Sequence, residues 1–185
     1  MGMARAMSHE TIARAGINRG ALHAGVALAL VRALSSYSWL DGALWGKDAK
    51  FAPDFLRGAG LAQRITTGKT AFVHTTLVPG VASFLTGTVV PHASLFAWLI
   101  ALGELVTGCS LLLGLFARLG GALAISQALV NIVIAGGGSQ DTLGHNYMLL
   151  IVGLGVLLAA AGRTYGLDRL LIERYPSSRL LRLVS

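Results

Sequence analysis

The sequence predicts an all-α integral membrane protein, a four-helix bundle with a long loop on its outer face. Of its 185 residues, 54% are hydrophobic and only 12% are charged, whereas a soluble domain carries about 25% charged residues. Four apolar stretches are long enough to cross the hydrocarbon core of a bilayer, which takes about 20 helical residues. Because nearly all other residues belong to loops and tails, we expect residues 1–185 to form one membrane domain.

The first apolar stretch predicts a retained membrane span over residues 20–40. It is longer than the core of a cleavable signal peptide, which has about 7–15 residues. An aromatic and charged collar typical of a membrane interface lies at its end, formed by Trp39, Asp41, Trp45 and Lys47. We therefore expect the chain to leave the membrane at this point.

The next segment, residues 46–90, is predicted to lie on the outer face. A helix starting at Pro53 has apolar residues on one face and is expected to lie on the membrane surface. Residues 70–90 carry no charge and are nearly long enough to span, but Pro79 and Gly80 interrupt them. A fifth span there would put the C-terminal arginines opposite the N-terminal ones, against the positive-inside rule. We expect a broken helix instead, re-entrant or interfacial, covered by other protein segments.

Three further spans are expected at residues 92–115, 122–135 and 146–161, with a glycine-rich loop at residues 136–138. Glycines and alanines recur within the spans and allow helices to approach closely. Four spans place both termini on one face, and the placement of Lys and Arg predicts that this face is cytoplasmic. We expect a multi-pass protein of the cell membrane with both termini in the cytoplasm.

The net charge of +7 does not indicate nucleic-acid binding. Nine of the fifteen Lys and Arg lie in the N-terminal tail, beside the third span or after the last span. That placement sets membrane topology and attracts anionic head groups, so the expected partner is the lipid bilayer. The single cysteine, Cys109, cannot form a disulfide within the chain and is expected to serve helix packing.

Arg32 and Glu104 are the candidate functional pair. Each is the only charged residue in its apolar run, residues 20–40 and 91–116 respectively. A lone charge at the bilayer centre costs at least about 2.5–3.5 kcal/mol, so such residues pair or line a functional pocket. Counting residues from the outer ends of the two spans puts both near mid-depth, within about 6 Å vertically. The pair either fixes helix register as a buried salt bridge or handles a ligand or proton.

Other polar side chains are predicted at mid-depth or toward the outer leaflet. An apolar pocket there suits a quinone, whose carbonyls need hydrogen-bond donors and whose reduction needs two protons. Arg32 would anchor the head group, Glu104 would relay a proton, and His74 or His92 would supply outer-side protons. Asn131 and Asn146 are further candidate quinone ligands, although such amides can also simply join helices. No haem or metal is expected, because the histidines lack ligand spacing.

Sequence motifs in three helices resemble the DoxX/DoxD superfamily. Glu104 is followed by Gly108 and by a block resembling the family's L-G-L-x-x-R pattern, and a closing motif follows the last span. The matching residues are Arg32, Gly46-Lys47, Glu104, Gly108, Leu113-Gly114-Leu115-Phe116-Ala117-Arg118-Leu119-Gly120 and Ala161-Gly162-Arg163-Thr164-Tyr165-Gly166-Leu167-Asp168. The long outer loop makes the chain most similar to DoxD, the small membrane subunits of thiosulfate:quinone oxidoreductases. The resemblance implies a four-helix membrane fold, a redox partner, and functional or fold-defining roles for Arg32, Lys47, Glu104 and Arg118.

The resulting hypothesis is a membrane subunit of a quinone-linked oxidoreductase complex in a respiratory chain, with quinone bound near the Arg32/Glu104 pair. Whether the chain is itself an enzyme is left open. One alternative is a non-catalytic anchor or accessory subunit that docks a partner protein, and another is a small-solute or ion carrier. A redox partner subunit is expected, and a homo-oligomer is compatible with the sequence. The electron donor, the partner and the type of quinone are not encoded in any recognisable motif.

Overall fold

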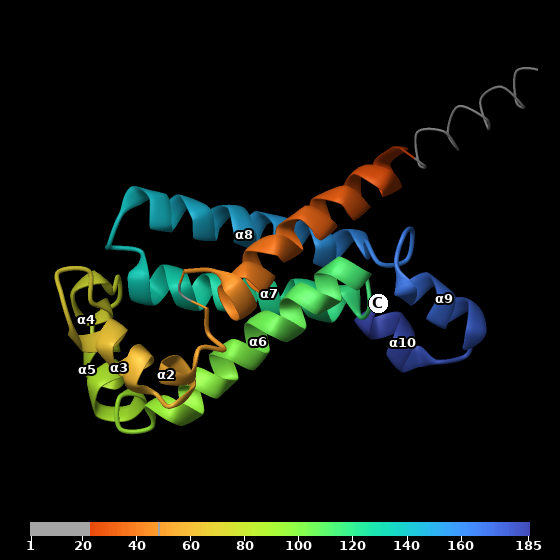
Figure 1. Ribbon diagram of the computed structural model, residues 1–185. Helices are drawn as coiled ribbons and strands as arrows, with labels where there is room; N and C mark the ends of the chain where they lie inside the picture. Colours follow the sequence, from red (N-terminus) through yellow and green to blue (C-terminus); the bar gives the residue numbers. More distant parts are fainter. Residues whose placement is uncertain (1–22, 48) are drawn as a thin grey trace, which may run out of the picture.

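The computed structural model describes residues 23–47 and 49–185, which form helices joined by turns, with no strand among them (Figure 1). The longest helices cover residues 23–40, Ala93–Leu113 (α6), Ala117–Ala135 (α7) and Gln140–Ala159 (α8). Within the described part, α6, α7 and α8 are long and apolar enough to cross a membrane. The predicted all-α membrane fold is confirmed. The first residues of the expected span at 20–40 lie outside the described part.

Two of the long helices begin earlier than predicted. The side chain of Ser139 accepts a hydrogen bond from the Thr142 N–H at 3.0 Å and caps α8 six residues before the expected start. His145 and Asn146 therefore lie within α8, and the connection between α7 and α8 is residues 136–139 rather than the residues 136–145 left between the two expected spans. Helix α7 starts at Ala117, so Arg118 lies in its first turn rather than in a connecting turn.

The four long helices share one apolar core. Close packing of α7 against α8 depends on small residues, since a Cβ at Gly121 would lie 2.9 Å from the Gly153 carbonyl oxygen. Figure 1 shows these two helices running side by side. The core residues come from all four helices and the turn after α8: Trp39, Leu111, Ala117, Ala124, Ala128, Leu149, Val156 and Ala161.

Residues 41–47 and 49–89 form a series of short helices, of which those after residue 52 gather at one end of the molecule (Figure 1). These are the π-helical turn η1 (Asp41–Trp45), α2 (Pro53–Leu56), α3 (Ala59–Thr66), α4 (Phe72–Thr75), α5 (Val81–Phe84) and a second π-helical turn, η2 (Leu85–Val89). The predicted break within residues 70–90 is confirmed: α4 ends before Pro79, and Gly80 has a φ of +85°.

The helix expected from Pro53 is present, but it is interrupted at Gly58 (φ +90°) into α2 and α3. Its apolar face does not face lipid as a surface helix would. Phe55 and Ile65 are buried with Leu85 and Ala97 in a second apolar cluster, between the short helices and α6. The segment is therefore part of the folded protein rather than a helix lying separately on the bilayer.

The C-terminal helices α9 (Leu167–Arg174) and α10 (Arg179–Val184) lie at the opposite end from α2–α5 (Figure 1). The first helix starts near them, because Gly25 packs closely against Thr164. The described start of the first helix and the C-terminal part of the chain thus share one end of the molecule. That this end is cytoplasmic stays a prediction.

Candidate functional site

Arg32 is buried where the first helix crosses the C-terminal end of α6. Its guanidinium donates hydrogen bonds to two backbone carbonyls, those of Tyr165 (Nη2, 2.7 Å) and Ala161 (Nη1, 3.4 Å). Gly114 has a φ of +62° and leaves room for this guanidinium, which a Cβ at that position would strike. A charge inside an apolar core is thereby partnered by carbonyls that lack other helix partners.

Asp168 completes the same junction from the other side. Its carboxylate is fully buried and accepts hydrogen bonds from the N–H groups of Phe116 (2.6 Å) and Ala117 (2.9 Å) at the start of α7. It also lies near enough to attract Arg32 electrostatically. A carboxylate on the first N–H groups of a helix satisfies orphan donors and complements the helix dipole. We call Arg32, Gly114, Ala161, Tyr165 and Asp168 the arginine junction.

Glu104 lies in the middle of α6, among different neighbours. Its Oε2 lies 3.7 Å from Lys50 Nζ, and this oxygen accepts no hydrogen bond from the described residues. Gly42 in η1 packs directly against it, since a Cβ there would lie 2.9 Å from Oε2. The carboxylate is nine-tenths buried with one lysine as its ion-pair partner.

The predicted Arg32–Glu104 ion pair is wrong. Arg32 lies beside Gly114, ten residues further along α6 than Glu104, which corresponds to about 15 Å of helix. The error arose at the outer end of the first helix, which was placed at Leu40. The helix in fact continues through η1, so Leu40 packs on Gly108 and Gly42 reaches the level of Glu104.

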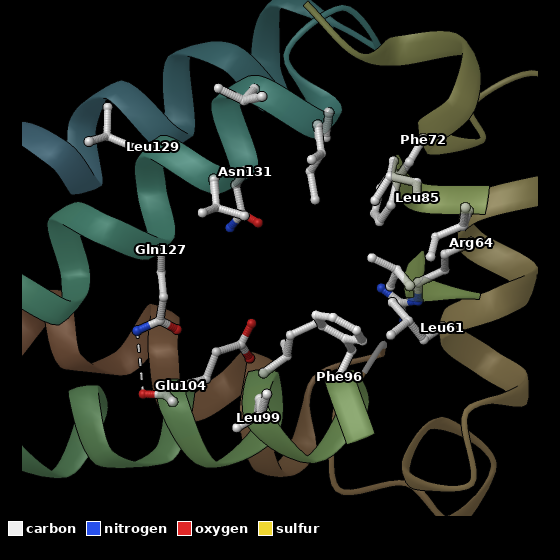
Figure 2. A pocket seen from close by; sticks show the side chains of 18 of the residues that line it. Leu61, Arg64, Phe72, Leu85, Phe96, Leu99, Glu104, Gln127, Leu129 and Asn131 are labelled. Carbon is white, nitrogen blue, oxygen red and sulfur yellow. Dashed lines mark hydrogen bonds between the residues drawn. The ribbon is translucent and has the colours of Figure 1, made fainter. Parts of the chain in front are cut away.

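A largely apolar pocket of about 910 Å³ opens beside Glu104 (Figure 2). It lies between α6, α7, the start of α8 and the short helices α2–η2. Figure 2 shows Glu104 and Asn131 pointing into it from α6 and α7, with Arg64 of α3 across from them. Its polar lining residues are Lys50, Arg64, Glu104, Ser126, Gln127, Asn131, Thr142 and Asn146.

The two cations of the pocket are held near one aromatic ring. Lys50 Nζ lies 5.9 Å and Arg64 Cζ 5.4 Å from the centre of the Phe55 ring. Both distances are within the range of cation–π attraction. Phe55 is buried in the second apolar cluster, so it fixes the part of the pocket wall that faces Glu104 across the cavity.

The pocket amides differ in how they are held. Gln127 donates to the Thr107 hydroxyl at 2.7 Å and so joins α7 to α6. Asn146 is buried and donates to the Thr142 carbonyl at 2.8 Å. Asn131 is half-buried, and its amide faces the cavity (Figure 2).

Several residues predicted as quinone ligands lie elsewhere. Lys47 is exposed and does not line the pocket. His74 is exposed on α4, and exposed His92 has its Nδ1 3.0 Å from the Thr88 carbonyl, so neither histidine faces the cavity. Arg32 is at the arginine junction, also outside the lining. Glu104, Asn131 and Asn146 do line it.

Lys50 and Arg64 were missed by the sequence reasoning, and Gln127 was considered only as part of a general polar group. Lys50 reaches Glu104 because the chain after η1 folds back, with its N–H donating to the Gly42 carbonyl at 2.9 Å. Nothing in the local sequence distinguishes Lys50 from Lys47 as the residue that reaches inward. Arg64 could have been noted as the cation on an otherwise half-apolar helix, three residues from Leu61.

Comparison with known families gives one match. Residues 59–137, from α3 to just past α7, match the family model described as DoxX, and this stretch contains Glu104, Gln127 and Asn131. Comparison with curated proteins gave no match, and neither did comparison with solved structures. The match confirms the resemblance to the DoxX superfamily, while the closer likeness to DoxD stays a prediction. The chain is a membrane protein whose residues 59–137 match the DoxX family model.

Proposed function

We propose that this chain is the membrane subunit of a quinone-linked oxidoreductase complex and that it binds quinone in the Glu104 pocket. The observation that carries the proposal is a largely apolar cavity of about 910 Å³ lined by the buried carboxyl group of Glu104, which is paired with Lys50. The proposal rests on this cavity and not on an Arg32–Glu104 pair. The DoxX match supports it, because this family is often associated with oxidoreductase-related subunits.

The residues of the pocket fit a quinone by size and by chemistry. Small-molecule sites are typically about 300–1,000 Å³, mostly apolar, with a few polar groups that set orientation. Here the apolar wall suits a hydrophobic ring, and the polar groups converge from α6, α7 and α3. The Glu104 carboxyl accepts no hydrogen bond at Oε2 from the described residues, so a ligand group that donates to this carboxyl would satisfy a buried acceptor.

The chain's own residues would bind the head group and move protons. A quinone, when bound, accepts two electrons and two protons. The Asn131 amide can donate a hydrogen bond to a ring carbonyl, and the Glu104 carboxyl can hold a proton and release it into the pocket. Lys50, 3.7 Å from Glu104, is placed to return a proton from water, because both side chains keep a small exposed fraction. Electrons would come from a partner subunit.

The test is purification of the protein in mild detergent, followed by extraction and mass spectrometry of bound quinone. We expect quinone in the wild-type protein and a loss of about tenfold or more in its affinity for Glu104→Gln, which removes the titratable group but keeps the shape. Glu173→Gln is the matched control, because Glu173 makes an exposed pair with Arg169 on α9. Quinone reduction in membranes should fall with Glu104→Gln and not with Glu173→Gln.

The result that would overturn the proposal is a wild-type protein without quinone, or one in which Glu104→Gln changes neither quinone content nor electron transfer. The second outcome would favour the alternative of a non-catalytic accessory subunit. Deleting part of the η1–α3 connection would then be expected to break the complex with a partner.

A further inference from the structure

Helices α6 and α7 spread apart toward the end of the molecule that carries α2–α5 (Figure 1), and residues of both helices line the Glu104 pocket. They are joined near the arginine junction, where Gly120 packs directly against Ser110, and again by the Gln127–Thr107 hydrogen bond. They diverge toward the end of the molecule where the short helices α2–α5 lie (Figure 1). The pocket is thus bounded by protein on the side of Phe55 and Ile65 and by the two diverging helices elsewhere.

The rim between these helices is apolar and exposed. Leu99 on α6 is 58% exposed and Val130 on α7 is 56% exposed, and both line the pocket. Leu129 and Phe84 are also exposed lining residues. Leu99 and Val130 lie well inside helices that are long and apolar enough to span, so their exposed sides face acyl chains rather than water.

The polar groups of the pocket lie deeper than this rim. Glu104 is about one and a half helical turns beyond Leu99, is nine-tenths buried and lines the cavity. Figure 2 places Glu104, Asn131 and Arg64 around the cavity. The pocket therefore grades from a polar interior to an apolar mouth that opens sideways into lipid.

We infer that the pocket takes its ligand from the bilayer through the mouth between Leu99 and Val130, and that the bound ligand keeps a hydrophobic tail in this mouth. The inference rests on the proposed function and narrows it to quinones with a long isoprenoid tail. The head group lies near Glu104 and Asn131, and the tail passes Leu99 and Val130 into the acyl chains. A tail in the mouth covers apolar surface that the protein leaves open, and its burial adds affinity.

The test compares two quinones with the same naphthoquinone head: menaquinone, which has an isoprenoid tail, and menadione, which has none. The full chain is reconstituted in lipid nanodiscs, and bound quinone per protein is measured over a titration. Leu99→Trp and Val130→Trp fill the mouth from its two sides. Leu102→Trp is the control, because Leu102 is an exposed leucine of α6 that does not line the pocket.

We expect each mouth variant to weaken menaquinone binding about tenfold and to change menadione binding by less than about threefold, with Leu102→Trp affecting neither. If wild-type protein binds menaquinone and both mouth variants bind it equally well, the lateral mouth is refuted while the quinone proposal stands. Equal losses of both quinones in the mouth variants would refute the assignment of the tail. Wild-type protein that binds neither quinone would refute the proposed function together with this inference.

Discussion

The arginine junction and the Glu104 pocket begin from the same sequence feature and end differently. Each is built on a lone charge in a long apolar run. At the junction, Arg32 donates to the Tyr165 and Ala161 carbonyls, and Asp168 accepts two backbone N–H groups. In the pocket, Glu104 has one lysine at 3.7 Å and an oxygen without a donor, beside a cavity.

The difference shows that a charge within a membrane span does not by itself indicate function. What separates the two regions is what the charge is paired with. Arg32 donates to two backbone carbonyls, although its Nε donates to no described residue, whereas Glu104 is paired with a lysine side chain at 3.7 Å and borders a cavity. A charge whose hydrogen bonds join several backbone segments holds the fold, because removing it leaves buried backbone groups unpaired. A charge paired with one side chain beside open volume is better placed to meet a ligand.

The largest expected effect on stability is at Asp168. Replacing it with alanine removes two charge-assisted hydrogen bonds to buried N–H groups at the start of α7 and should cost about 3 kcal/mol of folding free energy. The thermal midpoint of the protein in detergent measures this loss. Asp54→Ala, at an exposed position on α2, is the control and should leave the midpoint unchanged. A thermal midpoint for Asp168→Ala equal to that of the wild type would contradict the claim that the arginine junction stabilises the fold.

Arg32→Met should have the next largest effect on stability. It should also distinguish the arginine junction from the Glu104 pocket. It keeps an unbranched side chain in the space beside Gly114 but removes the donors to Tyr165 and Ala161, at a cost of about 2 kcal/mol. Bound quinone per folded protein should be unchanged, because Arg32 does not line the pocket. Loss of quinone from the folded variant would place Arg32 in the site after all.

Gly42→Ala should weaken quinone binding with little effect on stability, which is the reverse of the result expected for Arg32→Met. A Cβ there lies 2.9 Å from Glu104 Oε2, so the flexible carboxylate must shift, while the backbone need not. We expect quinone affinity to fall about threefold with little change in thermal midpoint. Gly155→Ala on α8 is the matched control, since its Cβ meets nothing within 4 Å. That control should bind quinone normally and gain about 0.5 kcal/mol from helix propensity.

The smallest effect is expected at the pair of Arg169 and Glu173, which joins an Nε and a carboxylate oxygen 2.8 Å apart on the surface of α9. The hydrogen bond to Glu173 raises the pKa of Arg169 above its ordinary value, so the guanidinium stays charged throughout the physiological range. Exposed pairs of this kind contribute little. Glu173→Gln should leave both the thermal midpoint and quinone binding unchanged, and a fall in either would show a role for α9 that its exposure does not suggest.

Hydropathy and helix-breaking residues predicted most of the fold. The spans follow from runs of apolar residues, and the break near Pro79-Gly80 follows from the restricted backbone of proline and the positive φ of Gly80. The start of α7 was missed because the carboxylate on its first N–H groups comes from elsewhere: Asp168 is far along the chain from Ala117. The start of α8 was missed although its cap, Ser139, is local. A cap made by a distant residue leaves no local signal.

The site was harder to predict, because depth in the membrane does not give direction around a helix. Glu104, Asn131 and Asn146 line one cavity as expected, whereas His74 and His92 lie on exposed faces. The Arg32–Glu104 pair failed because Leu40, taken as the outer end of the first helix, packs against Gly108 well inside α6, and the first helix continues beyond it through η1. The depth of a residue in the membrane, when counted from an expected interface, carries any error in the position of that interface.

The most direct measurement is photo-crosslinking with an azidoquinone in native membranes, followed by peptide mapping of the labelled chain. If the pocket end holds the ligand and the junction end holds the fold, the label should fall on α6 and α7 near Glu104 and Asn131, and Glu104→Gln should reduce it. Label on the first helix near Arg32 or on residues 161–168, unaffected by Glu104→Gln, would contradict the division of roles between the two ends.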